Sequence, residues 1–284
     1  MASFAERMGH RAVRSLTQSD SLDDETRTEL WNVTDILRTI LQKAARSDYS
    51  KTQDNLLRAI WTRVFKLAAD ERSRDDQVWT RIKERMLRAE WFDVLDLIEQ
   101  LTVYVERNED HPTKGVAAAI VTAYNGRFES HLVGYRFIGL EIAPIDTTAE
   151  AQAVSDAIDD AASITGARHH LERAVDLLSD RQTQDYPNSI KESISAVEAV
   201  CAAVTGESTL GAAIKRLQSA GVKIHPALER AWSAMYGWTS DADGIRHGSI
   251  EAPEADQALA KYMLVTCSAF VSHVIEAGRK AGLI

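Results

Sequence analysis

Residues 186–198 read YPNSIKESISAVE, and with the residues that follow up to position 205 they predict an amphipathic α-helix. An α-helix turns by about 100° per residue, so side chains three, four and seven positions apart share a face. The apolar side chains of this segment recur at that spacing and form one narrow stripe of Ile190, Ile194, Val197, Cys201 and Val204. We expect the stripe to face a helical core, and Pro187 suits the first turn of the helix.

Three charged side chains of this helix lie outside the stripe. Glu198 falls about 80° from it, at the edge of the buried face, and Lys191 lies near Glu198, two turns earlier. Glu192 is expected to point away from the core, toward solvent or a partner chain. The helix therefore offers two carboxylates and one amine beside its apolar stripe.

A second informative segment, residues 232–248, reads WSAMYGWTSDADGIRHG. Its aromatic residues give way to a polar loop with several glycines that ends in Arg246 and His247. A guanidinium beside an imidazole can hold a phosphate and move a proton, and metal-free RNA cleavage needs both. The structural alternative is that Arg246 forms an ion pair with a glutamate and fastens the loop to the helix.

The rest of the chain is also predicted to be mainly helical, from apolar residues at helical spacing. Aromatic side chains such as Phe92 and Tyr104 are expected in the core. Residues 131–143 instead alternate, contain β-formers and turn glycines, and predict a short β-hairpin. A composition change near 143–147 predicts an N-terminal domain over 1–145 and a C-terminal helical domain over 146–284. One helix is expected to open near Asp23, with apolar residues at helical spacing from Leu30 to Leu41. Further helices are expected over 52–69, 75–88, 90–107, 114–130, 148–163, 166–180, 208–219, 225–236 and 254–278.

Composition narrows the classes of function. The 284 residues carry 33 basic and 42 acidic side chains, a net charge of −9. Without a basic arm, tight nonspecific binding to a nucleic-acid duplex is not expected, although a local site for one RNA loop is compatible with this charge. The charged N-terminus does not resemble a signal peptide, and no apolar run approaches the roughly 20 residues that span a bilayer. We therefore expect a soluble, cytoplasmic protein without a membrane partner.

Common catalytic motifs do not occur in the sequence. It contains no phosphate-binding glycine loop, no Gly-x-Ser-x-Gly elbow and no His-Glu-x-x-His. His169 and His170 are adjacent and point about 100° apart on a helix, which disfavours a shared metal ion. Residues 241–244 read DADG and are better explained as a turn than as part of a calcium loop. Cys201 and Cys267 lie in apolar helical runs and are expected to be small buried side chains. No metal and no cofactor is predicted.

Several segments of the chain read FAERMG (4–9), LWNV (30–33), YRF (135–137), EIAPI (141–145), SIKESISAVE (189–198), TLG (209–211), IHPAL (224–228) and YGWTSDADGIRH (236–247). Together they resemble the bacterial AbiJ-like abortive-infection proteins. The segments up to residue 145 resemble an AbiJ N-terminal domain of the fourth type.

This resemblance implies that the C-terminal domain is a HEPN-like helical bundle. Such bundles are usually dimeric, and their active members are metal-independent endoribonucleases of antiviral and toxin–antitoxin systems. Their signature is an Arg followed, after four to six residues, by a His. Arg246 matches the Arg and His247 the polar residue after it, but the positions for the closing His hold Glu251, Ala252 and Pro253. Three alternatives follow: His247 acts as the base in place of the closing His, a partner chain completes the site, or the domain is noncatalytic.

The resulting hypothesis is a bacterial antiphage protein that acts on RNA as a metal-independent endoribonuclease. The partners that it implies are RNA, further copies in a homodimer or higher oligomer, and a phage or antitoxin protein. The alternative is a noncatalytic sensor or interaction module that binds a nucleotide, RNA or a protein. The candidate catalytic residues are Arg246, His247, Glu198 and Glu192, and the candidate RNA- or phosphate-binding residues are Lys191, Tyr236, Trp238 and Ser240.

Overall fold

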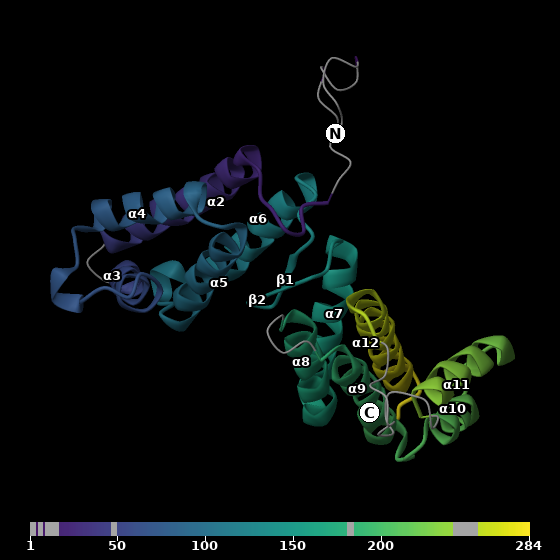
Figure 1. Ribbon diagram of the computed structural model, residues 1–284. Coiled ribbons are helices and arrows are strands. Elements are labelled where there is room, and N and C mark those ends of the chain that lie inside the picture. Colours follow the sequence, from purple (N-terminus) through teal and green to yellow (C-terminus); the bar gives the residue numbers. More distant parts are fainter. Residues whose placement is uncertain (1–3, 5–7, 9–16, 47–49, 181–184, 241–254) are drawn as a thin grey trace. The chain divides into compact units, whose positions relative to one another are not determined.

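The computed structural model describes residues 4, 8, 17–46, 50–180, 185–240 and 255–284. The chain divides into two compact units (Figure 1). Unit 1 comprises Met1–Ile142 with Asp146–Thr148, and unit 2 comprises Ala143–Ile145 with Ala149–Ile284. Both units are mainly helical and the described part of the chain has one short hairpin, so the predicted fold class is confirmed.

In unit 1, helix α2 packs against α4 and α6, and α5 packs against α3 and α6. The N-terminus of α2 is capped by Asp23, whose carboxylate accepts a hydrogen bond from the backbone N–H of Thr26 at 2.8 Å. The core contains the expected aromatic residues with one exception. Phe92 is 55% exposed, because it lies in the first turn of α5 on the same outer face as the exposed Asp96. The helices are α2 (Asp24–Ala45), α3 (Thr52–Ala59), α4 (Asp75–Arg88), α5 (Trp91–Arg107) and α6 (Val116–Ser130).

The single helix predicted over 52–69 is wrong in its second half. Helix α3 continues into a π-helical turn, η1 (Ile60–Val64), in which the N–H of Phe65 donates to the carbonyl of Ile60 at 2.9 Å. The turn ends at Lys66, whose φ of 55° lies in the left-handed region. The indole of Trp61 then donates to the carbonyl of Ala68 at 2.7 Å and holds the chain away from the helical path. Short 3-10 turns follow at η2 (Ala69–Glu71) and η3 (His111–Thr113).

The predicted hairpin over 131–143 is confirmed as two short strands, β1 (Arg136–Ile138) and β2 (Glu141–Ala143). Arg136 is buried and donates to four oxygens. Its guanidinium contacts the carbonyls of Val133, Tyr135 and Asp146, each at 2.7 Å, and the hydroxyl of Thr148 at 3.2 Å. These bonds satisfy a buried cation and fix the chain that leaves the hairpin.

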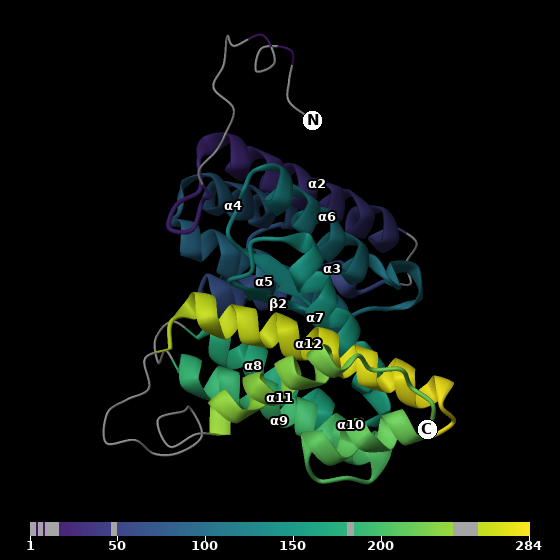
Figure 2. The same cartoon turned by 90° about the vertical axis from the view of Figure 1, so that its right-hand side faces the viewer.

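In unit 2, α9 packs against both α8 and α12, and Figure 2 shows α12 lying across α8 and α9. Helix α10 packs on α9, and α11 packs on α10 and α9. The elements are α7 (Thr148–Asp160), the 3-10 turn η4 (Ala161–Ser163), α8 (Thr165–Ser179), α9 (Tyr186–Thr205), α10 (Leu210–Ser219), α11 (Pro226–Ser240) and α12 (Gln257–Lys280).

The apolar stripe predicted for α9 is confirmed, because all five of its side chains are at most 3% exposed. Asp185 caps the N-terminus of the helix by accepting from the N–H of Asn188 at 3.2 Å, and Gly206 ends it in the left-handed conformation with φ of 77°. Both cysteines are free and buried, as expected. Helix α9 is thus the centre of the core of unit 2.

By length and hydropathy alone, two segments could cross a membrane, so the prediction that no apolar run is long enough is wrong. Tyr186–Ser219 and Gln257–Lys280 are both long and apolar enough to cross a bilayer, with 39% and 50% of their most apolar windows buried. These segments contain α9 and α12, which pack against each other in the core of unit 2. Core helices of a soluble domain have the same composition, so the finding is weak evidence for membrane insertion.

Candidate functional site

Helix α11 leads into the segment that contains Arg246 and His247, and two aromatic side chains anchor it to unit 2. The hydroxyl of Tyr236 hydrogen-bonds to the Glu198 carboxylate on α9. The ring of Trp232 lies edge-on to Phe270 of α12, with centroids 4.5 Å apart, and 5.7 Å from the ring of His273. Through these contacts α11 is held against both α9 and α12, close to the end of the helix at Ser240.

The structure therefore brings together two of the predicted site residues, Glu198 and Tyr236, both of which are half-buried. Trp238 is 41% exposed on the same helix, and Ser240 is its last residue. Arg246 and His247 lie outside the described residues, together with Glu251, Ala252, Pro253 and the turn predicted at 241–244. Their predicted roles, and the ion pair that is the structural alternative, stay predictions.

Glu192 lies on another face of α9, apart from Glu198. The offset of six positions between them corresponds to a rise of about 9 Å and a rotation of about 240°. The Glu192 carboxylate is 2.6 Å from Nδ1 of His170 on α8, and the two side chains are 24% and 34% exposed. The expectation that Glu192 points away from the core is thus wrong, because α8 packs closely along that side of α9. Lys191 is exposed.

The contact between His170 and Glu192 places a carboxylate against an imidazole nitrogen. A carboxylate bound to Nδ1 orients an imidazole and favours the tautomer in which Nε2 can accept a proton. The sequence pattern points to His170 only as a candidate metal ligand and gives no link to Glu192. The available signal was the short connection between the two helices, which makes α8 and α9 antiparallel neighbours.

The cysteines do not supply a nucleophile. Burial, with a smaller contribution from the nearby Glu198 carboxylate, raises the pKa of Cys201 to about 12. Burial alone raises the pKa of Cys267 to about 12. A thiol is nucleophilic as its thiolate, so both side chains are inert at neutral pH. Among the residues that the structure describes, no group of three or more His, Cys, Asp or Glu side chains is placed to hold a metal ion.

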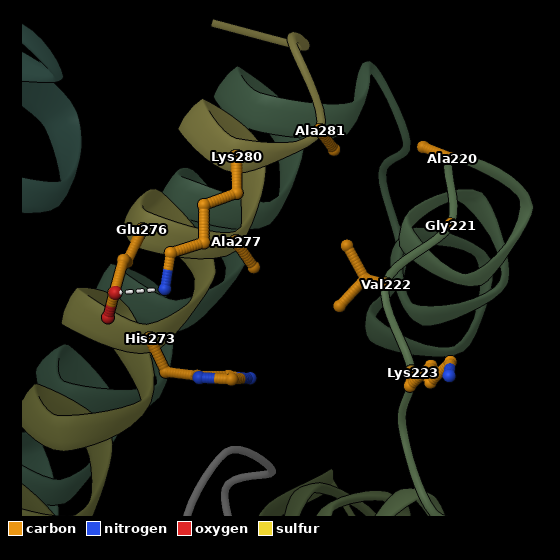
Figure 3. A pocket seen from close by; sticks show the side chains of 9 residues that line it. All are labelled: Ala220, Gly221, Val222, Lys223, His273, Glu276, Ala277, Lys280 and Ala281. Carbon is orange, nitrogen blue, oxygen red and sulfur yellow. Dashed lines mark hydrogen bonds and ion pairs between the residues drawn. The ribbon is translucent and has the colours of Figure 1, made fainter.

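A cavity of about 300 Å³ lies in unit 2 between the connection from α10 to α11 and the last turns of α12 (Figure 3). Figure 3 shows Val222 and Ala277 facing the gap from opposite walls, with His273 reaching into it. Lys280 also lines the cavity, but its ammonium forms an ion pair with Glu276 on the same helix. None of the predicted site residues that the structure describes lines this cavity, although His273 connects it to Trp232 on α11.

Comparison with known proteins identifies the N-terminal part of the chain. The family model described as AbiJ N-terminal domain 4 matches residues 2–160, which is more than half of the 284 residues. The matched segment includes the helices and hairpin of unit 1 and ends with α7, so the HEPN-like interpretation of the later helices is not part of the match. No curated protein and no solved structure matches the chain. The chain therefore belongs to the AbiJ N-terminal domain 4 family.

Proposed function

We propose that this protein stops phage infection by cleaving RNA with the C-terminal helices. Membership in the AbiJ N-terminal domain 4 family indicates an abortive-infection, antiphage protein. The contact between Tyr236 and Glu198 is the observation that carries the finer proposal. It fixes the end of α11 against a carboxylate of α9, immediately before the segment that contains Arg246 and His247. A stable helix end and a nearby acid suit the positioning of a catalytic pair.

The proposed reaction needs no metal ion. Arg246 binds the scissile phosphate and stabilises the charge that develops on its oxygens. His247 takes the proton of the 2′-hydroxyl, whose oxygen bonds to phosphorus while the bond to the 5′ oxygen breaks. The leaving 5′ oxygen takes up a proton from a water molecule and His247 releases its proton to solvent, so the products end in a 2′,3′-cyclic phosphate and a 5′-hydroxyl. Glu198 orients the pair, and Tyr236, Trp238, Ser240 and Lys191 contact the RNA.

The test is induction in a bacterial host of the wild type, Arg246→Ala and His247→Ala, with Arg230→Ala as a matched control. Arg230 is an exposed arginine of α11, so its replacement removes the same charge close to the same segment. We expect growth arrest and EDTA-resistant RNA fragments with 5′-hydroxyl ends from the wild type and Arg230→Ala, and neither from the other two. Intact RNA in wild-type cells throughout phage challenge would refute the ribonuclease.

A second candidate function is recognition without cleavage. The replacement of the closing His of the HEPN signature by Glu251, Ala252 or Pro253 favours it. In that case the same segment binds a nucleotide, RNA or a protein, and the protein signals infection to another component. Phage protection that persists in His247→Ala without RNA fragments would support this function over the first.

The proposal also includes the assembly and location of the protein. We propose a homodimer or higher oligomer in the cytoplasm, with a phage or antitoxin protein as regulator. Light scattering on the purified chain measures the oligomer directly. Affinity purification from infected and uninfected cells, compared with Arg246→Ala, tests for the regulator.

A further inference from the structure

The π-helical turn η1 in unit 1 is a costly piece of backbone with no role in the site described above. π-helices are rare and occur mostly as single turns, often at functional sites. Here the turn is followed by Lys66, a non-glycine residue with φ of 55°. Such conformations cost of order 1–3 kcal/mol each and persist where the surrounding structure holds them in place. Backbone departures of this kind cluster at functional sites.

Exposed cations lie around this turn, and two of them are held over aromatic rings. The Cζ atom of Arg81 on α4 lies 5.3 Å from the ring centroid of Trp61 and 6.0 Å from that of Phe65. The Cζ atom of Arg63 lies 5.7 Å from the ring centroid of Tyr104 on α5. Trp61 and Tyr104 are buried, so each ring supports its guanidinium from the protein side. This arrangement restricts the two side chains and leaves them exposed to solvent.

Local charge contrasts with that of the whole chain, which is −9. Residues 58–67 contain three basic and no acidic side chains, and residues 81–88 contain four basic and one acidic. Two of these cations are engaged, because Arg58 pairs with Asp54 at 3.7 Å and Arg85 with Asp93 at 2.7 Å.

Three others form what we call the η1 cations: Arg63, Lys66 and Arg81. Within the described residues, none of them forms an ion pair with a carboxylate. The carboxyl of Asp96 lies near enough to Lys66 to interact with it electrostatically. Burial raises the pKa of the Asp96 carboxyl, and Arg85 and Lys66 oppose that effect. The surface thus keeps exposed positive charge in an acidic protein, which favours an anionic partner.

We propose that the η1 cations form a binding site for single-stranded RNA. A flexible single strand can bring its phosphates to separate cations, and a guanidinium supported by an aromatic ring can stack on an unpaired base. Paired bases in a duplex do not expose their faces for such stacking. This proposal goes beyond the ribonuclease proposal and does not depend on it, because all of the residues belong to unit 1.

The experiment measures binding of the full-length chain to a labelled single strand of about 16 nucleotides by fluorescence anisotropy. The probe is 2′-O-methyl RNA of mixed sequence, which cannot undergo attack by its own 2′-oxygen. Each phosphate contact contributes about 0.7 to the slope of log affinity against log salt concentration. With three phosphates neutralised, the affinity should therefore fall about twentyfold between 50 and 200 mM salt. We expect Arg63→Gln/Lys66→Gln/Arg81→Gln to weaken binding at least tenfold at the lower salt and to lose most of that slope.

The matched control is Lys43→Gln/Lys114→Gln/Arg127→Gln, which removes the same charge from other exposed positions of unit 1. It should bind within about twofold of the wild type, as expected when distant exposed charges are screened. Circular dichroism checks that each variant is folded. Arg81→Gln alone, which disturbs less, should lower the slope by about 0.7.

Three results would overturn the proposal: unchanged binding by the triple variant, an equal loss in the control, or equally effective competition by duplex RNA or polyphosphate. Loss of RNA binding in Arg63→Gln/Lys66→Gln/Arg81→Gln, with binding retained in the control variant, supports the proposal whether or not the wild type cleaves RNA. Conversely, a failure of the ribonuclease would appear as intact RNA in cells while this binding is retained. The two proposals can therefore fail separately.

Discussion

Gly278 on α12 provides a sharp test of the packing between α12 and α9. A Cβ atom at this position would lie 2.3 Å from Cγ1 of Val204 and 3.4 Å from Cγ1 of Ile284. Ordinary carbon contacts begin near 3.4 Å, so one of the helices must move by about 1 Å. Val204 is β-branched and has few alternative rotamers in a helix, so it cannot easily turn away. Gly278→Ala should therefore crowd the interface.

The magnitude follows from two opposing contributions. Replacing a helical glycine by alanine normally stabilises a helix by about 0.5–1 kcal/mol. Overpacking a close-packed core typically costs about 1–3 kcal/mol. We therefore expect Gly278→Ala to lower the free energy of unfolding by about 1–2 kcal/mol. Gly211→Ala in α10 is the matched control, because an added Cβ there meets nothing within 4 Å and should give the stabilisation alone.

The assay is urea unfolding followed by circular dichroism, with hydrogen exchange of the α9 and α12 amides reporting on unit 2. Val204→Ala removes the clashing methyl group, so the double variant Val204→Ala/Gly278→Ala should show a favourable coupling energy of about 1–2 kcal/mol. A Gly278→Ala variant as stable as Gly211→Ala, or a double-mutant cycle without coupling, would refute this packing.

Three further predictions concern buried polar groups. Arg136→Lys should destabilise unit 1 by about 2–4 kcal/mol in urea unfolding, because an ammonium cannot replace the four guanidinium bonds; an unchanged midpoint would contradict this. Cys201 and Cys267 should not react with a thiol reagent at pH 8 in the native chain and should both react in denaturant, because burial raises each pKa to about 12; rapid labelling of native protein would show that they are accessible. Burial raises the pKa of the Glu99 carboxyl, although the hydrogen bond from the N–H of Ile142 opposes this rise. The folded state therefore binds the carboxyl proton more tightly than the unfolded state does. The free energy of unfolding should fall as the pH rises through the folded pKa. Glu99→Gln should remove that part of the pH dependence, and a variant with the wild-type profile would contradict the assignment.

The helical core could be predicted from sequence wherever one face of a helix is uniformly apolar. The stripe of α9 lies where it was expected, since side chains at 3.6-residue spacing have one way to leave water together. Phe92 was predicted wrongly because an aromatic residue in an apolar run gives no sign of which turn of the helix reaches the surface.

The candidate site was predictable only in part. Glu198 was expected at the edge of the buried face, but its partner Tyr236 lies 38 positions later, and no local pattern connects the two. The contact of Glu192 with His170 was missed for the same reason, because it depends on how α8 packs against α9. Helical periodicity gives the direction of a side chain from its own axis and does not identify the neighbour that it meets.

By itself, the sequence determined the mainly helical class, the hairpin and the family of the N-terminal part, because periodicity, turn residues and family motifs are local properties of the chain. Only the tertiary structure decided where the helix after Thr52 changes into a π-turn and which cations gather around that turn. That outcome depends on Trp61 and Phe65 meeting α4, and on Tyr104 meeting Arg63. Contacts between elements distant in the chain outweigh the propensity of a few residues, because packing contributes more to helix stability than propensity does.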